Sequence, residues 1–128
     1  MNAEDYFNNG KVYVWKETFA VIKSKKINRH AFANIVDKNE ITVVIDESKV
    51  VKNEVMSIEK GWKLLTFDMM LPFELVGFIA NISRALADKK IPIFLVSAYS
   101  TDHILIKEKD LPKAKKCLQK LGFIINEK

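Results

Sequence analysis

Two short clusters, at opposite ends of a predicted helix–strand unit, carry residue types that would hold a small charged ligand. Gly77 lies near the start of the predicted helix, and a polar run over residues 97–102 (SAYSTD) follows the predicted strand. A helix start presents unpaired N–H groups and a partial positive charge, which suit a carboxylate. Glycine lets a ligand approach the backbone, and Asp102 would accept hydrogen bonds from an ammonium or guanidinium group. The two clusters would thus serve both ends of a zwitterion.

Each of these residues also has a purely structural explanation. Gly77 would allow close packing of the helix on a sheet, and Asp102 would brace its turn through backbone hydrogen bonds, as Asx residues often do. His103 begins a strand, where a surface or packing role is more common than ligand binding. Cys117 falls on an apolar helix face and is expected to be inert core. From the sequence, both interpretations of Gly77 and Asp102 stay open.

The motifs of the common catalytic classes are missing from the sequence. It contains no nucleophile elbow, P-loop, dinucleotide fingerprint or HExxH zinc motif. Ser97 and Ser100 have only His103 as a nearby base, and adjacency along the chain is not evidence of a triad. His30 lies far from His103 in sequence, so a metal site built on the two histidines has little support. We therefore expect no enzyme activity, no metal and no cofactor.

Composition favours a small globular protein of the cytoplasm. The 128 residues are 48% hydrophobic, which suffices for one domain or two very small ones that share a core. No apolar run reaches membrane-spanning length, and residues 1–11 lack the pattern of a signal peptide. Cys117 is the single cysteine, so no internal disulfide can form. The net charge of +5 comes from lysines spread in short groups, which favours a role in solubility over nucleic-acid binding.

The second half of the chain, residues 61–126, has the predicted element order β-α-β-β-α-β. Its strands are expected at 62–67, 91–97, 103–107 and 123–125. The first helix has an apolar stripe, and the second ends before Gly122. This order folds as a ferredoxin-like antiparallel sheet with both helices on one face. The stripe of the first helix consists of Leu75, Ile79, Ile82 and Leu86.

The first half of the chain is smaller and rich in strands. Residues 1–10 are expected to form a loose arm, followed by strands at 11–15 and 19–23 that are joined by residues 16–18. A hairpin of strands 32–36 and 40–45 follows, and residues 46–60 are expected to be a surface linker. The predicted fold class is therefore α+β, with a strand-rich partial domain over residues 1–60 packed against a ferredoxin-like domain over residues 61–128.

Several segments of the second half together resemble the ACT domain, the small regulatory module of amino-acid metabolism. They are Pro72-Phe73 before the helix, residues 77–80 (GFIA), residues 87–93 (ADKKIPI), residues 97–106 (SAYSTDHILI) and residues 108–111 (EKDL). The similarity is greatest to small stand-alone members of the subgroup that contains the aspartate kinase ACT domains and the cytosolic arginine sensor. It covers about half of the chain, and the first half matches only in the order of its strands.

This resemblance implies a ligand-binding module that acts as a homodimer and does not catalyse a reaction. It implies a small-molecule ligand, most often an amino acid, held between the start of the first helix and the end of the second strand. Because no enzyme domain accompanies the module in this sequence, a regulatory output would pass through the dimer or through a separate enzyme or regulatory chain. By position, the ligand-binding residues would be Gly77, Phe78 and Ile79 on the helix side and Ala98, Tyr99, Thr101 and Asp102 on the strand side.

Two alternatives of other classes remain. One is a protein–protein interaction module whose ligand site is vestigial, with the apolar strand at 91–96 used for pairing. The other is an RNA-binding ferredoxin-like domain, which would need aromatic residues on its two central strands to stack bases. Phe67 is available on one of these strands, but residues 103–107 (HILIK) contain no aromatic side chain, so RNA binding is the weaker alternative.

Overall fold

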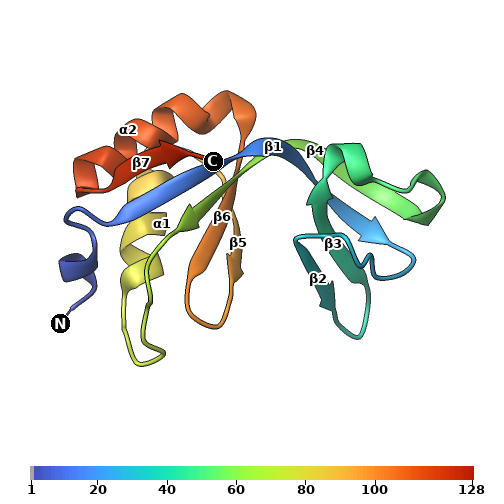
Figure 1. The fold of residues 1–128 in the computed structure, drawn as a ribbon, viewed down its shortest axis with the longest axis horizontal. Helices are drawn as coiled ribbons and strands as arrows, with labels where there is room; N and C mark the ends of the chain where they lie inside the picture. The colour runs from blue at the N-terminus through green and yellow to red at the C-terminus, as the bar shows by residue number, and fades with distance from the viewer. Residues whose placement is uncertain (1) are drawn as a thin grey trace. The chain divides into compact units, whose positions relative to one another are not determined.

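The computed structural model describes residues 2–128 (Figure 1). Its contacts divide the chain into two units, of which the first contains Lys63–Lys128 together with the chain up to Lys16, and the second contains Glu17–Trp62. Two long strands, β1 (Lys11–Ser24) and β4 (Val55–Phe67), contribute residues to both units. The expected division into domains 1–60 and 61–128 stays a prediction.

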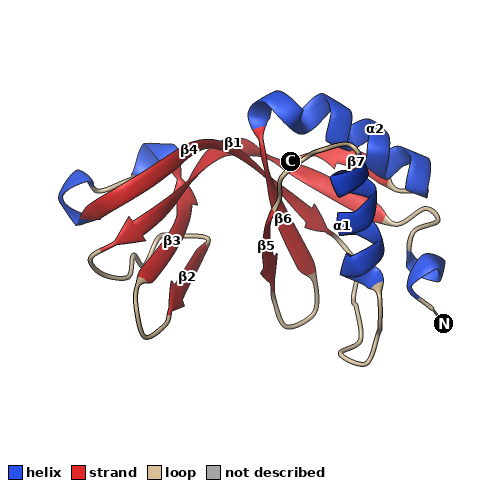
Figure 2. Cartoon of the chain, turned by 180° about the vertical axis from the view of Figure 1, so that it is seen from behind, coloured by secondary structure: helices blue, strands red, loops and turns tan. Residues whose placement is uncertain are grey.

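The first unit has the ferredoxin-like α+β arrangement that the sequence predicts. Its sheet has the strand order β7–β1–β4–β6–β5, with β5 (Phe94–Ser97), β6 (Asp102–Lys107) and β7 (Ile124–Glu127). The helices α1 (Phe78–Asp88) and α2 (Leu111–Leu121) cover the same face of this sheet (Figure 2). β1 lies between β4 and β7 and pairs in parallel with β7, from Lys11 opposite Ile124 to Val14 opposite Glu127.

Side chains alternate between the two faces of the central strands, and those on both faces are buried. In β4, Leu65 and Phe67 belong to the core under the helices, and Leu64 and Thr66 point to the opposite face, where they too are buried. In β6, Ile104 and Ile106 join the helix-side core in the same way. Such two-sided burial favours apolar residues at consecutive positions, as at Leu64–Leu65 in β4 and Ile104–Ile106 in β6.

Four phenylalanines from four separate segments meet at the centre of the first unit. The ring of Phe67 lies 5.5 Å from that of Phe78 and 5.4 Å from that of Phe123, and Phe7 lies 5.3 Å from Phe123. These centroid distances are typical of favourable edge-to-face or tilted aromatic pairs. The cluster fixes the start of α1 against the end of β4.

The prediction of a loose arm over residues 1–10 is wrong for residues 2–10, and residue 1 lies outside the described residues. A short 3₁₀ helix, η1 (Ala3–Tyr6), is closed by a capping box in which Asn2 and Asp5 each accept a hydrogen bond from the other's backbone N–H. Ala3 and Phe7 are buried in the helix-side core. Because the segment is mostly polar, the burial of Ala3 and Phe7 was not predicted from its sequence.

Four predicted element boundaries are also wrong. Residues 16–18 do not interrupt β1, because partner strands on both sides of this point maintain the ladder despite its weakly β-forming sequence. Residues 55–60 belong to β4 and not to a linker, which leaves only the 3₁₀ turns η2 (Glu47–Lys49) and η3 (Lys52–Glu54) before it. β5 begins at Phe94, three residues later than predicted, and α1 begins at Phe78, so Leu75 precedes the helix.

The second unit contains the predicted hairpin. β2 (Ala33–Val36) pairs antiparallel with β3 (Ile41–Asp46), which in turn pairs antiparallel with residues 19–24 of β1. Asp37 Oδ1 accepts hydrogen bonds from the N–H groups of Asn39 and Glu40 and forms the turn, as expected for aspartate. A small core of this unit consists of Ala20, Ile22, Val43 and Ile45.

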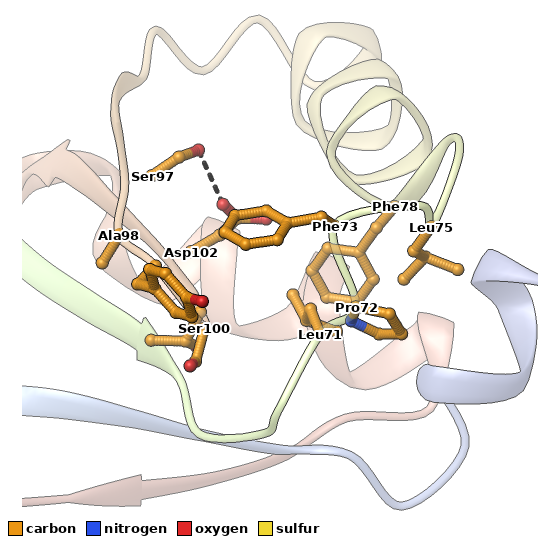
Figure 3. A pocket seen from close by; sticks show the side chains of 11 residues that line it. Leu71, Pro72, Phe73, Leu75, Phe78, Ser97, Ala98, Ser100 and Asp102 are labelled. Carbon is orange, nitrogen blue, oxygen red and sulfur yellow. Dashed lines mark hydrogen bonds between the residues drawn. The ribbon is translucent and has the colours of Figure 1, made fainter.

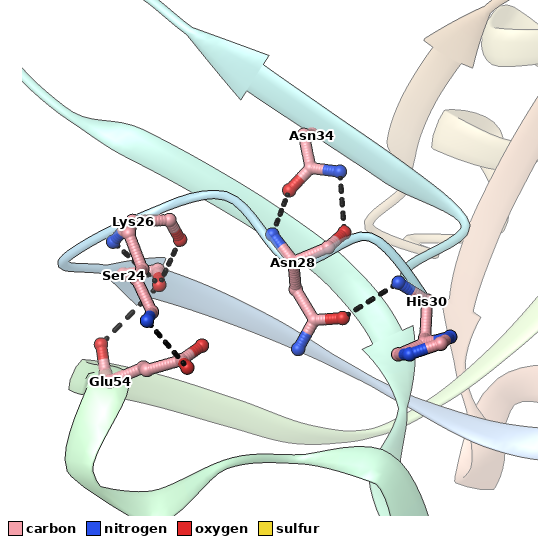
Figure 4. A network of polar contacts seen from close by, with 6 residues as sticks. All are labelled: Ser24, Lys26, Asn28, His30, Asn34 and Glu54. Atoms are coloured by element: carbon pink, nitrogen blue, oxygen red, sulfur yellow. Dashed lines mark hydrogen bonds and ion pairs between the residues drawn. The ribbon is translucent and has the colours of Figure 1, made fainter.

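Side-chain hydrogen bonds to the backbone hold the connector after β1 in place (Figure 4). Ser24 Oγ donates to the carbonyl of Lys26 at 2.7 Å, and Lys26 Nζ lies 3.6 Å from Glu54 Oε2. Asn34 accepts from the N–H of Asn28 and donates to its carbonyl, at 2.8 and 2.9 Å. Such bonds replace the strand-to-strand hydrogen bonds that a connector lacks.

Within residues 2–128, none of the helices has the length and apolar content that crossing a membrane requires.

Gly122 provides a test of the packing between α2 and the N-terminal segment. Its φ of +114° is left-handed, and a Cβ would lie 3.1 Å from Asn8 Cα and from the Phe7 carbonyl oxygen. We expect Gly122→Ala to lower the free energy of unfolding by about 2–3 kcal/mol, from left-handed strain plus the clash. Gly61→Ala is the matched control, because Gly61 has φ +81° but nothing within 4 Å, and it should cost only about 1 kcal/mol. Equal losses in urea unfolding of the two variants would contradict this account.

Candidate functional site

The first unit contains an open cavity of about 370 Å³ between the segment that precedes α1 and the turn that joins β5 to β6 (Figure 3). This volume lies at the small end of the range for small-molecule sites. Five of the seven predicted site residues line it, and Gly77 and Ile79 do not. The lining residues are Leu71, Pro72, Phe73, Leu75, Phe78, Ser97, Ala98, Tyr99, Ser100, Thr101 and Asp102.

Three backbone-directed hydrogen bonds build the two walls of this cavity. The N–H of Ala98 donates to the carbonyl of Thr101 at 2.9 Å and closes the β5–β6 turn. The N–H of Leu71 donates to the carbonyl of Ser100 at 2.8 Å and ties the segment before α1 to that turn. The hydroxyl of Thr101 donates to the carbonyl of Phe67, at the end of β4. The cavity is therefore a defined feature of the backbone.

Asp102 is the one charged residue among those that line the cavity, and it is half-buried. Its Oδ1 accepts a hydrogen bond of 2.6 Å from the hydroxyl of Ser97, directly across the β5–β6 ladder (Figure 3). Asp102 thus braces the turn through a neighbouring side chain. Because a carboxylate has about four acceptor positions, one hydroxyl leaves capacity for a ligand cation.

Gly77 does not have the packing role that its position suggests. A Cβ there would meet nothing closer than 4.0 Å, so close approach of the helix to the sheet does not demand glycine. The demand comes from the backbone, because Gly77 is the N-cap of α1 and has a left-handed φ of +90°. Among the described residues, the N-cap of α1 makes no side-chain capping hydrogen bond, because Gly77 has no side chain. The first N–H groups of α1, which include that of the cavity residue Phe78, therefore lack the usual capping partner.

Phe73 and Tyr99 form an exposed aromatic pair in the lining of the cavity. Their ring centroids lie 4.8 Å apart in an edge-to-face arrangement, yet Phe73 is 71% and Tyr99 is 81% exposed. Large apolar side chains at such exposure are usual where a ligand or partner covers them.

Six lining residues were not predicted, namely Leu71, Pro72, Phe73, Leu75, Ser97 and Ser100. Four of them, Pro72, Phe73, Ser97 and Ser100, lie in the sequence motifs Pro72-Phe73 and 97–102, which could have identified them. Nothing in the pattern distinguished Leu71 and Leu75 from core residues.

His103, next to Asp102, belongs to a buried polar chain on the sheet. Its Nδ1 lies 2.8 Å from Thr66 Oγ1, which also accepts a 2.8 Å hydrogen bond from Trp15 Nε1. Burial lowers the pKa of His103, and attraction to Asp102 opposes this effect in part. This residue therefore packs as expected.

The described residues contain no group of three or more metal-ligating side chains. Burial raises the pKa of the Cys117 thiol, which suits an unreactive core residue.

The family of the chain follows from its match to the ACT domain family, whose model covers residues 57–120. The chain belongs to the ACT domain family. The match begins at residue 57, within β4, and includes α1, β5, β6 and most of α2. It therefore contains all residues that line the cavity.

Solved structures share the fold of this ACT domain protein. A protein from Agobacterium tumefaciens has a TM-score of 0.80 at 20% identity, over 94% of each chain. The regulatory subunit of aspartate kinase from Thermus thermophilus, in its ligand-free form, has a TM-score of 0.65 at 7% identity, over 89% of this chain and 97% of the other. Aspartokinase III from E. coli, in complex with aspartate and ADP, has a TM-score of 0.64 at 12% identity, over 86% of this chain and 32% of the other. At these identities the likeness shows the fold.

The pKa of His103 gives a test of the buried chain. Because the folded state holds this pKa below its ordinary value of 6.5, the unfolded state binds a proton first, and stability should fall as the pH decreases through and below 6.5. We expect the melting temperature of His103→Asn, whose amide can still bond Thr66, to fall less than that of the wild type between pH 7.5 and pH 5. His30→Asn, at an exposed position, is the matched control. An unchanged pH dependence in His103→Asn would show that other groups cause the effect.

Proposed function

We propose that this protein is a non-catalytic regulatory module that binds an amino acid in the cavity between residues 71–78 and the β5–β6 turn. The observation that carries this proposal is the position of Asp102, a carboxylate with spare acceptor capacity in an amino-acid-sized cavity. The uncapped start of α1 supports it, because the first-turn N–H groups suit the ligand carboxylate. Membership of the ACT family and the likeness to regulatory subunits of aspartate kinase add further support.

The absence of catalysis is part of this proposal, and the serine geometry supports it. Ser97 donates its hydroxyl hydrogen bond to Asp102, and His103 Nδ1 is bonded to Thr66. The Ser97 hydroxyl and the Nδ1 atom of His103 are thus bonded to other groups, whereas an activated nucleophile would be bonded to its base. The regulatory output would pass to a separate chain, such as an enzyme of amino-acid metabolism in the cytoplasm.

A thermal-shift and calorimetric screen against the twenty amino acids tests ligand binding. A ligand at a hundredfold excess over its Kd stabilises the folded protein by about 2.7 kcal/mol, so at least one amino acid should raise the melting temperature clearly. Asp102→Asn removes the charge but keeps a partner for Ser97, and it should weaken binding about tenfold or more. Asp110→Asn, at the start of α2 and outside the cavity, should bind as the wild type does.

The result that contradicts amino-acid binding is the lack of any shift or heat for all twenty compounds. In that case the exposed Phe73 and Tyr99 would favour the second candidate function, a protein–protein interaction module whose cavity is vestigial.

We also propose that the module acts as a homodimer through the edge strand β5. In the sheet order β5 is an edge strand, and its Leu95 is 41% exposed. Edge strands offer unpaired backbone groups to another chain. We expect a dimer mass in light scattering for the wild type and a monomer for Leu95→Glu, whereas Met56→Glu, at an exposed apolar position in the second unit, should stay dimeric. A wild-type monomer at high micromolar concentration would rule the dimer out.

A further inference from the structure

We infer that the cavity selects an amino acid with an uncharged, apolar side chain and discriminates against charged and hydroxylated ones. This inference rests on the proposed function, since it specifies which amino acid that site accepts. It follows from the distribution of charge and apolar surface around the cavity.

The charges in the cavity wall can serve one ligand cation and no second one. Asp102 is the single ionisable carboxylate among the eleven lining residues, and neither lysine, arginine nor histidine is among them. If the α-ammonium group of an amino acid pairs with Asp102, a lysine or arginine side chain would place its own cation without a countercharge. An aspartate or glutamate side chain would lack a cationic partner and would lie near Asp102. Desolvation of an unpaired charge is strongly unfavourable.

The apolar side chains gather on the wall away from Asp102. Figure 3 shows the Ser97–Asp102 hydrogen bond toward the β5–β6 side of the cavity, and Leu75 and Phe78 toward the start of α1. Leu71 and Pro72 complete the apolar wall, and Phe78 is anchored by the phenylalanine cluster beneath it. A ligand whose ammonium group binds Asp102, and whose carboxylate meets the first N–H groups of α1, would then have Leu71, Pro72 and Leu75 as apolar neighbours of its side chain. Burial of each methylene there favours binding about fourfold.

The exposed aromatic pair adds to the same preference. Phe73 and Tyr99 line the cavity and are largely exposed, so a ligand in the cavity would remove aromatic surface from water. The hydrogen bond from Leu71 to Ser100 holds their two segments together, which means that this surface is in place before the ligand arrives. An apolar side chain gains from such contact, and a strongly hydrated one does not.

Two pairs of nearly identical ligands test the inference on the full-length protein by calorimetry. Norleucine is lysine without its ammonium group, and valine is threonine with a methyl group in place of the hydroxyl. We expect norleucine to bind at least tenfold more tightly than lysine, and valine several-fold more tightly than threonine. The inference is overturned if lysine equals or exceeds norleucine, or threonine equals or exceeds valine. In those cases amino-acid binding itself stands, whereas the lack of binding by all four ligands and the other amino acids would remove the proposed function as well.

Variants of Leu75 show whether the apolar wall causes the preference. Leu75→Ala should weaken the binding of norleucine and valine several-fold and change the binding of lysine little. The ratio of the lysine Kd to the norleucine Kd should therefore become smaller. Leu111→Ala is the matched control, because this half-buried leucine packs on the same core but lies outside the cavity. Melting curves without ligand establish that both variants fold. An unchanged ratio in folded Leu75→Ala would refute the role of this wall.

Discussion

The contact among Phe7, Phe67, Phe78 and Phe123 is the constraint on which the rest of the first unit depends. It joins the N-terminal segment, the end of β4, the start of α1 and the entry to β7, which are far apart in sequence. Aromatic rings of this size bury large apolar areas and have preferred mutual orientations. Since Phe78 also lines the cavity, the same cluster that stabilises the fold sets the position of one cavity wall.

The rest of the cavity depends on backbone geometry. Gly77 begins α1 in a left-handed conformation, which lets the chain turn sharply from the cavity segment into the helix. The Leu71–Ser100 hydrogen bond and the Thr101–Phe67 hydrogen bond then connect three chain segments around one hollow. The residues that line the cavity thus sit on short loops held by the sheet and helix, which is a common arrangement in binding proteins.

The chemical character of the site comes from what its walls contain and omit. One carboxylate, several hydroxyl groups and an apolar wall together suit a small molecule with a single cation and a carbon-rich body. The neighbouring His103 contributes to the sheet and not to the cavity, because its ring nitrogen Nδ1 is bonded to Thr66 in a buried chain. Adjacent residues in β6 thereby have separate roles, as the alternation of side chains along a strand requires.

The sequence by itself determined the fold class, the hairpin at 33–46, both helices of the first unit and the two segments that form the cavity. These features rest on local patterns: the 3.6-residue stripe of α1, the glycine after α2, the Asp37 turn and the polar run at 97–102. The family resemblance, also carried by short segments, pointed to five residues that do line the cavity.

Only the tertiary structure decided the features that depend on distant partners. The continuity of β1 through residues 16–18 comes from partner strands on both sides, and the burial of Phe7 comes from three other phenylalanines. The cavity role of Leu71 and Leu75, and the absence of Gly77 and Ile79 from its lining, depend on the path of the chain before α1. A side chain in the core and one in a cavity wall have the same apolar character in sequence, and only packing distinguishes them.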